Sequence, residues 1–92
     1  MVKVLISEIH YIEAERNYCR IYTTNKEYLL VLSLREIEEK LPDRHFIRIH
    51  RSYIINLSQI MEVATTSLIV GQKLIPLSKS YRDELLKRLQ TI

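Results

Sequence analysis

Cationic side chains gather in three short segments of this 92-residue chain, and their types and spacing suit them to binding an anion. Residues 44–56 hold three arginines and two histidines but no carboxylate. Arg16 leads an Arg-Asn-Tyr triplet, and Lys79 and Arg82 both precede the next acidic residue, Asp83. Guanidinium and ammonium groups without acidic neighbours bind phosphates and donate hydrogen bonds to base edges. The three segments therefore predict contact with a polyanion.

Each of these arginines also fits a simpler role, that of a solvated charge at the rim of the molecule. Arg48 alternates with Ile47 and Ile49, as the outward residue of a half-buried strand does. His50, in the same apolar stretch, suits a hydrogen-bonded structural role as well as a base contact. A polyanion is favoured because all three segments lack carboxylates, whereas the helix expected at residues 33–41 carries its own acidic face.

Metal binding, catalysis and a bound cofactor have little support in the sequence. The candidate ligands His10, Cys19, His45 and His50 show no CxxC or HxxxH spacing, and we expect no metal or cofactor. There is no glycine-rich phosphate loop and no nucleophile elbow, so we do not expect an enzyme. A single cysteine excludes an intrachain disulfide and fits a reducing compartment, and a lone strand cysteine is usually a small buried apolar group.

Length and composition indicate one small folded domain spanning residues 1–92. The net charge is +3, which permits a nucleic-acid partner without demonstrating one. No run of about 18 apolar residues exists, and the start lacks the apolar region of a signal peptide. We therefore expect no membrane partner and a cytoplasmic location.

The spacing of apolar residues predicts a mostly β chain. Short strands are expected at residues 2–6, 9–13, 18–24, 27–32, 46–49, 53–56, 60–64, 67–70 and 73–76. Turn residues predict two hairpins, one around Asn25-Lys26 and one around Gly71-Gln72. Because these strands follow one another at short spacing, we expect antiparallel sheets.

The first of two expected helices lies in the middle of the chain. Ser33 and Glu36 have the spacing of a capping box, in which each side chain bonds to the other residue's backbone N–H. Leu34, Ile37 and Leu41 form its apolar stripe, and Pro42 should end it.

The second expected helix closes the chain. Ser78 or Ser80 should open it, and Ser80 with Asp83 has the spacing of a second capping box. Its apolar stripe consists of Tyr81, Leu85 and Leu89. A helix start at this point would turn free backbone N–H groups toward an anion.

Four segments stand in a characteristic order between about residues 9 and 89: YIEAERNYCRIYT, SLREIEEKLP, HFIRIHRSYIIN and IPLSKSYRDELLKRL. Together they resemble the LytTR (LytR/AlgR-type) DNA-binding domain of bacterial response regulators. The resemblance implies small antiparallel sheets in an elongated, β-sandwich-like body with a mid-chain and a C-terminal helix, and no helix-turn-helix. It also implies loops that enter successive major grooves of promoter direct repeats, and a place at the C-terminal output end of a longer two-component regulator.

The resemblance places the DNA contacts in three loops. The expected base contacts are Arg51, Asn17, Lys79, Cys19 and Ser80. The expected phosphate or sugar contacts are Arg16, Tyr18, Arg48, His50, Ser52, Ser78 and Arg82. An arginine can bond two acceptors on guanine, and an asparagine can pair with adenine in the same way. Arg16 departs from the family pattern, which often has glycine at that place.

Two partners beyond DNA are compatible with the sequence: an upstream receiver domain outside these residues, and a second copy of the domain meeting it on DNA. The alternative from another functional class is a small β-rich module whose basic loops bind an acidic protein or sense a ligand. Such a module would not distinguish a specific duplex from scrambled DNA. RNA binding ranks lower, because the tyrosines fall within strand patterns rather than in exposed stacking positions.

Overall fold

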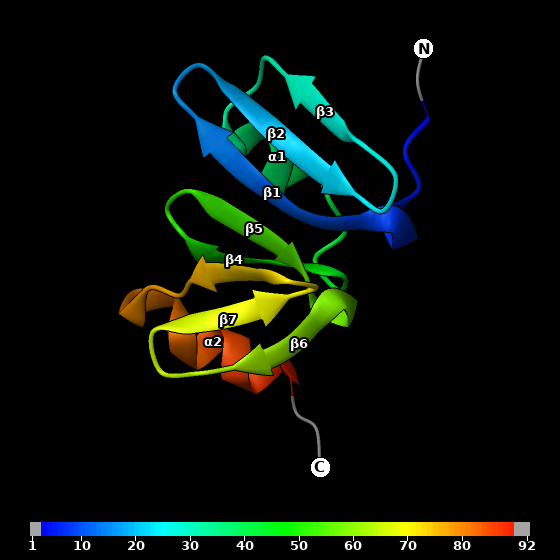
Figure 1. Ribbon diagram of the computed structural model, residues 1–92. Coiled ribbons are helices and arrows are strands. Elements are labelled where there is room, and N and C mark those ends of the chain that lie inside the picture. Colours follow the sequence, from blue (N-terminus) through cyan, green and yellow to red (C-terminus); the bar gives the residue numbers. More distant parts are fainter. Residues whose placement is uncertain (1–2, 90–92) are drawn as a thin grey trace.

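A computed structural model describes residues 3–89 as two antiparallel sheets and two α-helices (Figure 1). The five-stranded sheet has the order β3 (Glu27–Leu30), β2 (Tyr18–Thr23), β1 (Ile9–Glu15), β5 (Tyr53–Asn56), β4 (Phe46–His50). The three-stranded sheet has the order β6 (Ile60–Val63), β7 (Ser67–Val70), β8 (Lys73–Pro76). The molecule measures 40 × 23 × 23 Å, so the predicted elongated, mostly β body is confirmed.

Helix α1 (Leu34–Lys40) begins as its sequence predicts. The Ser33 hydroxyl accepts from the Glu36 amide, and the Glu36 carboxylate accepts from the Ser33 amide, both at 3.1 Å. These bonds lower the pKa of the Glu36 carboxyl, because they favour its charged form. Leu34 and Ile37 are buried, and the helix ends at Leu41, one residue before Pro42. The predicted capping box is confirmed.

Helix α2 (Lys79–Leu89) begins directly after Ser78, one of the two predicted opening residues, and two residues earlier than a capping box at Ser80 requires. Ser80 lies inside the helix and Ser78 precedes it, so the Ser80–Asp83 capping box is wrong. The predicted stripe does face the core: Leu85 is fully buried, and Leu89 packs against the same apolar cluster. Packing of this stripe on the sheets sets the helix position.

The strand expected at residues 2–6 is also wrong over the residues described, since Val2 lies outside them. Residues 3–5 are not in a strand, and Ile6 opens a 3-10 turn, η1 (Ile6–Glu8). The buried Asn56 amide donates to the carbonyls of Ile6 (3.2 Å) and Ile9 (2.9 Å). Strand β1 already has partners on both sides, β2 and β5, so no edge remains beside it for the preceding segment.

Both predicted hairpin turns are present. The Thr23 amide and hydroxyl donate to the Lys26 carbonyl at 3.0 and 2.6 Å, which closes the β2–β3 hairpin. Gly71 opens the β7–β8 turn with a φ of 63°, in the left-handed region where glycine has no steric penalty. A second 3-10 turn, η2 (Leu57–Gln59), joins β5 to β6 and is capped by Asn56.

Two apolar clusters hold these elements together. One joins the five-stranded sheet to the three-stranded sheet and α2 through Tyr11, Ile47, Ile49, Ile55, Leu68, Val70, Ile75, Leu77 and Leu85. The other lies beneath α1 and contains Ile9, Ile12, Cys19, Ile21, Leu34, Ile37, Phe46 and Ile54. Along β4, Ile47 and Ile49 enter the first cluster and Phe46 enters the second. Arg48 therefore shares a face with Phe46 and lies on the α1 side of the sheet.

Candidate nucleic-acid interface

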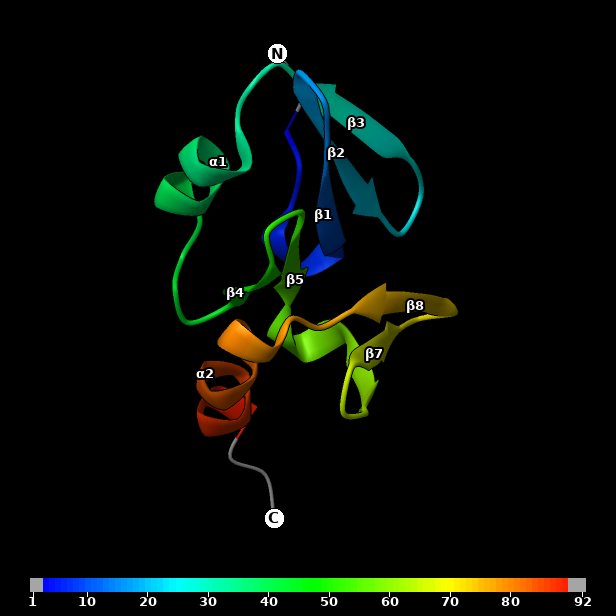
Figure 2. The same cartoon turned by 90° about the vertical axis from the view of Figure 1, so that its left-hand side faces the viewer.

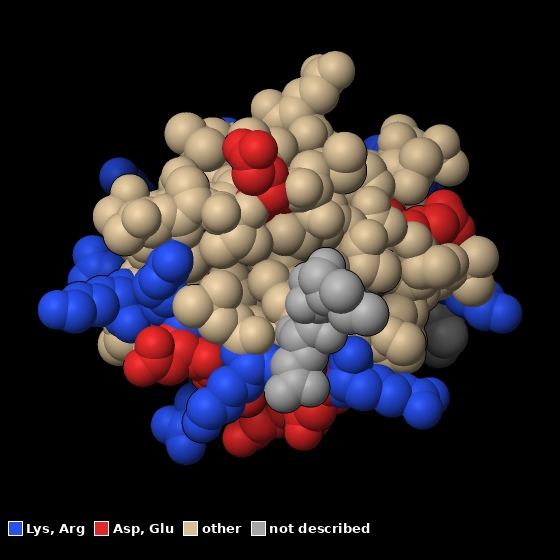
Figure 3. All heavy atoms as spheres, turned by 90° about the horizontal axis from the view of Figure 1, so that it is seen from below, with Lys and Arg blue, Asp and Glu red and all other residues tan. Residues whose placement is uncertain are grey.

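Three turns project from one side of the molecule. They are the β1–β2 turn (Arg16–Asn17), the β4–β5 turn (Arg51–Ser52) and the β8–α2 junction (Leu77–Lys79). All three lie at the left of Figure 1, and Figure 2 shows them one below another on the side facing the viewer. Seen from below, one group of lysine and arginine side chains lies at the left-hand edge, and others lie along the lower and right-hand edges with acidic side chains between them (Figure 3). The segments selected for their charge therefore share one face.

The β1–β2 turn is a two-residue hairpin loop, because Glu15 pairs directly with Tyr18. Arg16 has a φ of 44°, in the left-handed region that L residues other than glycine rarely adopt. Positive φ at the first of two loop residues is the type II′ pattern, which favours glycine there. Arg16 thus adopts the backbone shape expected of the family's glycine and adds an exposed guanidinium. The Asn17 side chain is exposed beside it.

The acidic residue next to this turn has its own partner. The Glu15 carboxylate accepts from Arg20 Nε at 2.8 Å, and this bond lowers the pKa of the Glu15 carboxyl. Arg20 also donates to Glu27 at 3.0 Å. Glu15 and Arg20 therefore neutralise each other on the strands and leave Arg16 free.

Cys19 requires a correction, since the structure does not support it as a base contact. Its side chain is 1% exposed and packs in the cluster beneath α1. Burial raises the pKa of the thiol, which keeps it neutral. Tyr18, the residue before it, is half-buried at the start of β2.

Arg48 also requires correction, because its guanidinium is committed to the β4–β5 turn. It donates to the His50 carbonyl at 2.8 Å, to the Arg51 carbonyl at 2.6 Å and to the Glu38 carboxylate of α1 at 2.9 Å. Only 18% of its side chain is exposed. With all three nitrogens occupied, Arg48 supports the turn and is a poor phosphate contact.

His50 supports the same turn from the other direction. Its Nδ1 accepts from the Ser52 amide at 3.1 Å, and its ring meets Tyr53 edge-on with centroids 5.6 Å apart. The Ser52 carbonyl accepts from the Ala14 amide at 2.9 Å, which ties the turn to β1. The structural role weighed for His50 is the one observed, and the exposed Arg51 side chain is left at the tip.

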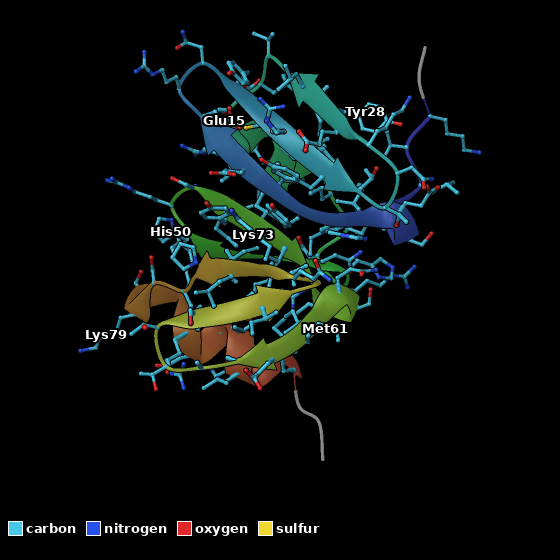
Figure 4. The ribbon with its side chains drawn as sticks, in the orientation of Figure 1. Glu15, Tyr28, His50, Met61, Lys73 and Lys79 are labelled. Atoms are coloured by element: carbon cyan, nitrogen blue, oxygen red, sulfur yellow. The ribbon has the colours of Figure 1, made fainter. Side chains whose placement is uncertain are left out.

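The β8–α2 junction is fixed by backbone bonds. The Leu77 amide donates to the Thr66 carbonyl at 3.0 Å, and the Ser78 amide donates to the Ile49 carbonyl of β4 at 2.9 Å. Lys79 and Ser80 are exposed at the start of α2, and Figure 4 shows Lys79 pointing away from the body. The junction therefore presents a free ammonium group on the same side as Arg51.

Arg82, another expected phosphate contact, also donates hydrogen bonds inside the protein. Its Nη1 donates to the carbonyls of Ala64 (2.7 Å) and Thr65 (3.0 Å) in the β6–β7 turn. These bonds join α2 to the three-stranded sheet and occupy one of the three guanidinium nitrogens. Arg82 therefore braces α2 through Nη1, and its contact with phosphate stays a prediction.

One arginine at this face was missed by the sequence reasoning. Arg35, at the start of α1, lines a surface hollow of about 450 Å³ together with Arg16, Arg48 and Arg51. It was overlooked because the polar face of α1 as a whole is acidic. Its position two residues after the Ser33 cap was the available signal, since it places Arg35 at the end of the helix rather than along that face.

Two further kinds of site were sought over the same residues. Within residues 3–89, no three His, Cys, Asp or Glu side chains are grouped so as to hold a metal ion. No helix in that range is long and apolar enough to cross a membrane.

Comparison with known proteins matches the chain to one family. The profile of the LytTr DNA-binding domain covers residues 1–90. The chain is 38% identical over 96 residues to the sensory transduction protein LytT of Bacillus subtilis, covering 97% of this chain and 39% of LytT. It is 38% identical over 58 residues to the transcriptional regulatory protein YpdB of Escherichia coli K12, covering 63% of this chain and 24% of YpdB.

A solved structure agrees with this match. The LytTr DNA-binding domain of a Bacillus cereus protein described as a methyl-accepting/DNA response regulator superposes with a TM-score of 0.86. The identity is 28%, and the match covers 98% of this chain and 88% of that one. The chain spans well under half the length of LytT and YpdB. It belongs to the LytTR family of DNA-binding domains.

Proposed function

We propose that this domain binds double-stranded DNA in a sequence-specific manner, by placing its three turns in successive major grooves at promoter direct repeats. On this proposal it is the output domain of a longer, cytoplasmic two-component response regulator that controls transcription, with a receiver domain upstream and a second copy beside it on DNA. The observation that carries the proposal is the alignment of three basic turns along one side of an elongated body.

Within this proposal, the free side chains at the tips divide into two roles. Arg51 reads a base, because it is exposed and its guanidinium can bond the O6 and N7 of guanine. Asn17 suits adenine, and Lys79 suits either a base or a phosphate. Arg16 contacts phosphate and sets the register. Four hydroxyl groups near these tips also contact the sugar-phosphate backbone of the DNA. They belong to Tyr18, Ser52, Ser78 and Ser80.

The arrangement favours recognition by loops because the turns are held in place before DNA arrives. Arg48 and His50 bond the backbone of the β4–β5 turn, and backbone bonds fix the β8–α2 junction. A preorganised contact loses less conformational entropy on binding than a mobile one. Hydrogen bonds used inside the protein are thus the reason that Arg51 and Lys79 can be positioned for DNA.

Selection of binding sites from random duplex DNA tests the proposal directly. We expect enrichment of two similar half-sites about one helical turn apart, the spacing at which two copies meet the same face of DNA. Affinity should fall with salt at a log–log slope of roughly −4 to −7, corresponding to about five to eight phosphate contacts. Equal binding to selected and scrambled duplexes would instead support an interaction module with basic loops.

The Arg51→Ala variant tests the assignment of the base reader. We expect it to relax the preference at one base position, at a cost of about 1–3 kcal/mol for the preferred base. Competition of duplexes that carry each base at that position measures this change. Arg44→Ala is the matched control, since Arg44 is also exposed but lies just before β4, away from the β4–β5 turn. Unchanged affinity and base preference in Arg51→Ala would contradict the assignment.

A further inference from the structure

The hollow between the first two turns has an unusual charge composition. It is bounded by the β1–β2 turn, the start of α1 and the β4–β5 turn, and its volume is about 450 Å³. Four arginines line it, namely Arg16, Arg35, Arg48 and Arg51, and no carboxylate does. Three different elements of the fold thus direct positive charge at one concavity.

Three of these arginines are available to a ligand. Within residues 3–89, ion pairs with carboxylates involve only Arg20 and Arg48. The Arg48 guanidinium is held by Glu38 and two carbonyls, so it forms part of the wall. Arg16, Arg35 and Arg51 are all exposed. The carboxylates adjacent in sequence to Arg16 and Arg35 also have hydrogen-bond partners. Glu15 accepts from Arg20, and Glu36 accepts from the Ser33 amide.

We propose that this hollow seats a phosphodiester group of the DNA backbone, with Arg35 as a phosphate contact on α1. The inference rests on the proposed function, because it requires a duplex lying along the side that carries the turns. Planar guanidinium groups donate paired hydrogen bonds to phosphate oxygens, so free arginines from separate elements suit a tetrahedral anion.

The position of the hollow explains why the occupant is a DNA strand. It lies between the turn that carries Asn17 and the turn that carries Arg51, which are proposed to enter DNA grooves. Grooves are separated by sugar-phosphate backbone, so a duplex that receives both turns places a strand between them. A phosphate held at this point would fix the register of both turns without reading sequence.

Two measurements on the Arg35→Ala variant and a selected duplex test the proposal. The salt dependence of affinity should lose about one unit of log–log slope, because one phosphate contact is removed. Affinity for selected and scrambled duplexes should fall by the same factor, about three- to tenfold, with base preference unchanged. Circular dichroism melting reports whether the variant is folded, and alanine suits an exposed helical position.

Replacing single phosphates by uncharged methylphosphonates locates the contact. At one linkage between the bases contacted by the β1–β2 turn and those contacted by the β4–β5 turn, the neutral group should lower the DNA affinity of the wild-type domain several-fold. The same replacement should leave the affinity of Arg35→Ala unchanged. Arg44→Ala, the matched control, should keep the wild-type sensitivity at that linkage. Titration of wild type with inorganic phosphate asks whether a free anion uses the same hollow. Saturable binding at millimolar phosphate that displaces no DNA would overturn the assignment to the backbone.

The outcomes separate this inference from the proposed function. If the wild-type domain selects a site but Arg35→Ala retains its full salt slope and phosphonate sensitivity, the phosphate seat is wrong and the proposed function stands. If the wild-type domain selects no site, the proposed function itself fails.

Discussion

At the residue scale, the arginines near the three turns differ in what their guanidinium groups contact. Arg48 and Arg82 donate to backbone carbonyls, whereas Arg16, Arg35 and Arg51 face solvent. A guanidinium with its donors bonded inside the protein has little left to offer a phosphate. The hydrogen-bond donors available to an anion are therefore fewer than the number of arginines suggests.

Arg16 combines a useful charge with an unfavourable backbone conformation. Its φ of 44° is costly for any residue with a Cβ, so Arg16→Gly should be more stable than Arg16→Ala by about 1 kcal/mol. Both variants lose the same guanidinium and should lose DNA affinity equally. Denaturant unfolding and DNA titration of the pair measure the two effects separately. Equal stability of the two variants would show that the turn does not strain residue 16.

Some of these residue roles were accessible from sequence and others were not. The burial of Cys19 follows from its place in an apolar strand, and the need for a tight first turn follows from the family pattern. The bonds of Arg48 and Arg82 did not follow, because they depend on which carbonyls of another element lie within reach. Such contacts are set by tertiary packing. The sequence alone does not distinguish an arginine that bonds carbonyls from one that binds phosphate.

At the scale of elements, the β4–β5 turn is shaped by side chains of its own strand. Arg48 bonds two carbonyls of the turn and His50 bonds an amide, so the turn carries hydrogen bonds that the strand ladder cannot supply. Arg48 also links the turn to Glu38 of α1. Arg48 and His50, two positions apart on β4, thus support the turn that carries Arg51.

Removal of the Arg48 guanidinium should loosen this turn. We expect Arg48→Met, which keeps the apolar stem, to lower the free energy of unfolding by about 1–3 kcal/mol, because two carbonyls lose a charged donor. Amide hydrogen exchange at residues 51–53 should accelerate, and preference for a selected duplex should drop more than affinity for scrambled DNA.

Glu38→Gln is the comparison for that variant. It removes only the ion pair with Arg48, and exposed pairs contribute about 0–1 kcal/mol. The Glu38 side chain is 45% exposed, so its variant should be nearly neutral. Equal losses in the two variants would mean that the ion pair, and not the carbonyl bonds, supports the turn.

Elements were predictable where their signals are local. The Ser33–Glu36 capping box and the turns at Asn25-Lys26 and Gly71-Gln72 depend on a few adjacent residues, and all are observed. The strand at residues 2–6 failed because pairing depends on a free sheet edge, which no local pattern reports. The sequence offered two opening residues for α2, Ser78 and Ser80, and the observed start at Lys79 fits Ser78.

At the scale of the whole molecule, a tyrosine cluster lies where the five-stranded sheet meets the core shared with the three-stranded sheet. Glu13 accepts from Tyr53 at 2.9 Å and from Tyr22 at 3.3 Å, and Tyr11 stacks on Tyr22 with centroids 4.3 Å apart. Burial and the bond to Glu13 raise the pKa of Tyr53 to about 12. Burial also raises the pKa of Tyr11 and of Tyr22.

These shifts predict the alkaline limit of stability. The folded protein holds the Tyr53 proton more tightly than the unfolded chain, whose tyrosine pKa is 10.0. The associated stability is complete below pH 10.0 and should be lost as pH rises toward about 12. Thermal unfolding at a series of alkaline pH values measures the loss, and phenolate absorbance shows whether ionisation accompanies unfolding.

Tyr53→Phe and Tyr28→Phe provide the matched pair for this measurement. Tyr53→Phe should be less stable than wild type at neutral pH, because Glu13 loses a donor. Its stability should also fall less steeply than that of wild type as pH rises above 10.0. Tyr28 lies on β3, where its ring meets Lys26, and the tyrosines bonded to Glu13 are Tyr22 and Tyr53. Its variant should follow the wild-type curve, and an unchanged decline in Tyr53→Phe would contradict the role assigned to the cluster.

The placement of the three turns on one side was predictable only through the family resemblance. The sequence of short strands indicates hairpins, but it does not say which ends of different hairpins meet. That depends on the strand order, in which β1 lies beside β5 although 37 residues separate the end of one from the start of the other. Besides the acidic polar face of α1, the same dependence on strand order hid Arg35, since its neighbours at the hollow come from distant strands.

The main-chain hydrogen bonds that tie the turns to neighbouring strands have a consequence for how the tips can vary. Ala14 is bonded to Ser52, and Ile49 to Ser78, through main-chain atoms that every residue type except proline can supply in the donor position. Side chains at the tips can therefore be exchanged during evolution without altering the distance between them. If the domain binds DNA as proposed, substitutions at Arg51 or Lys79 would change which sequence is bound while the turns stay in place.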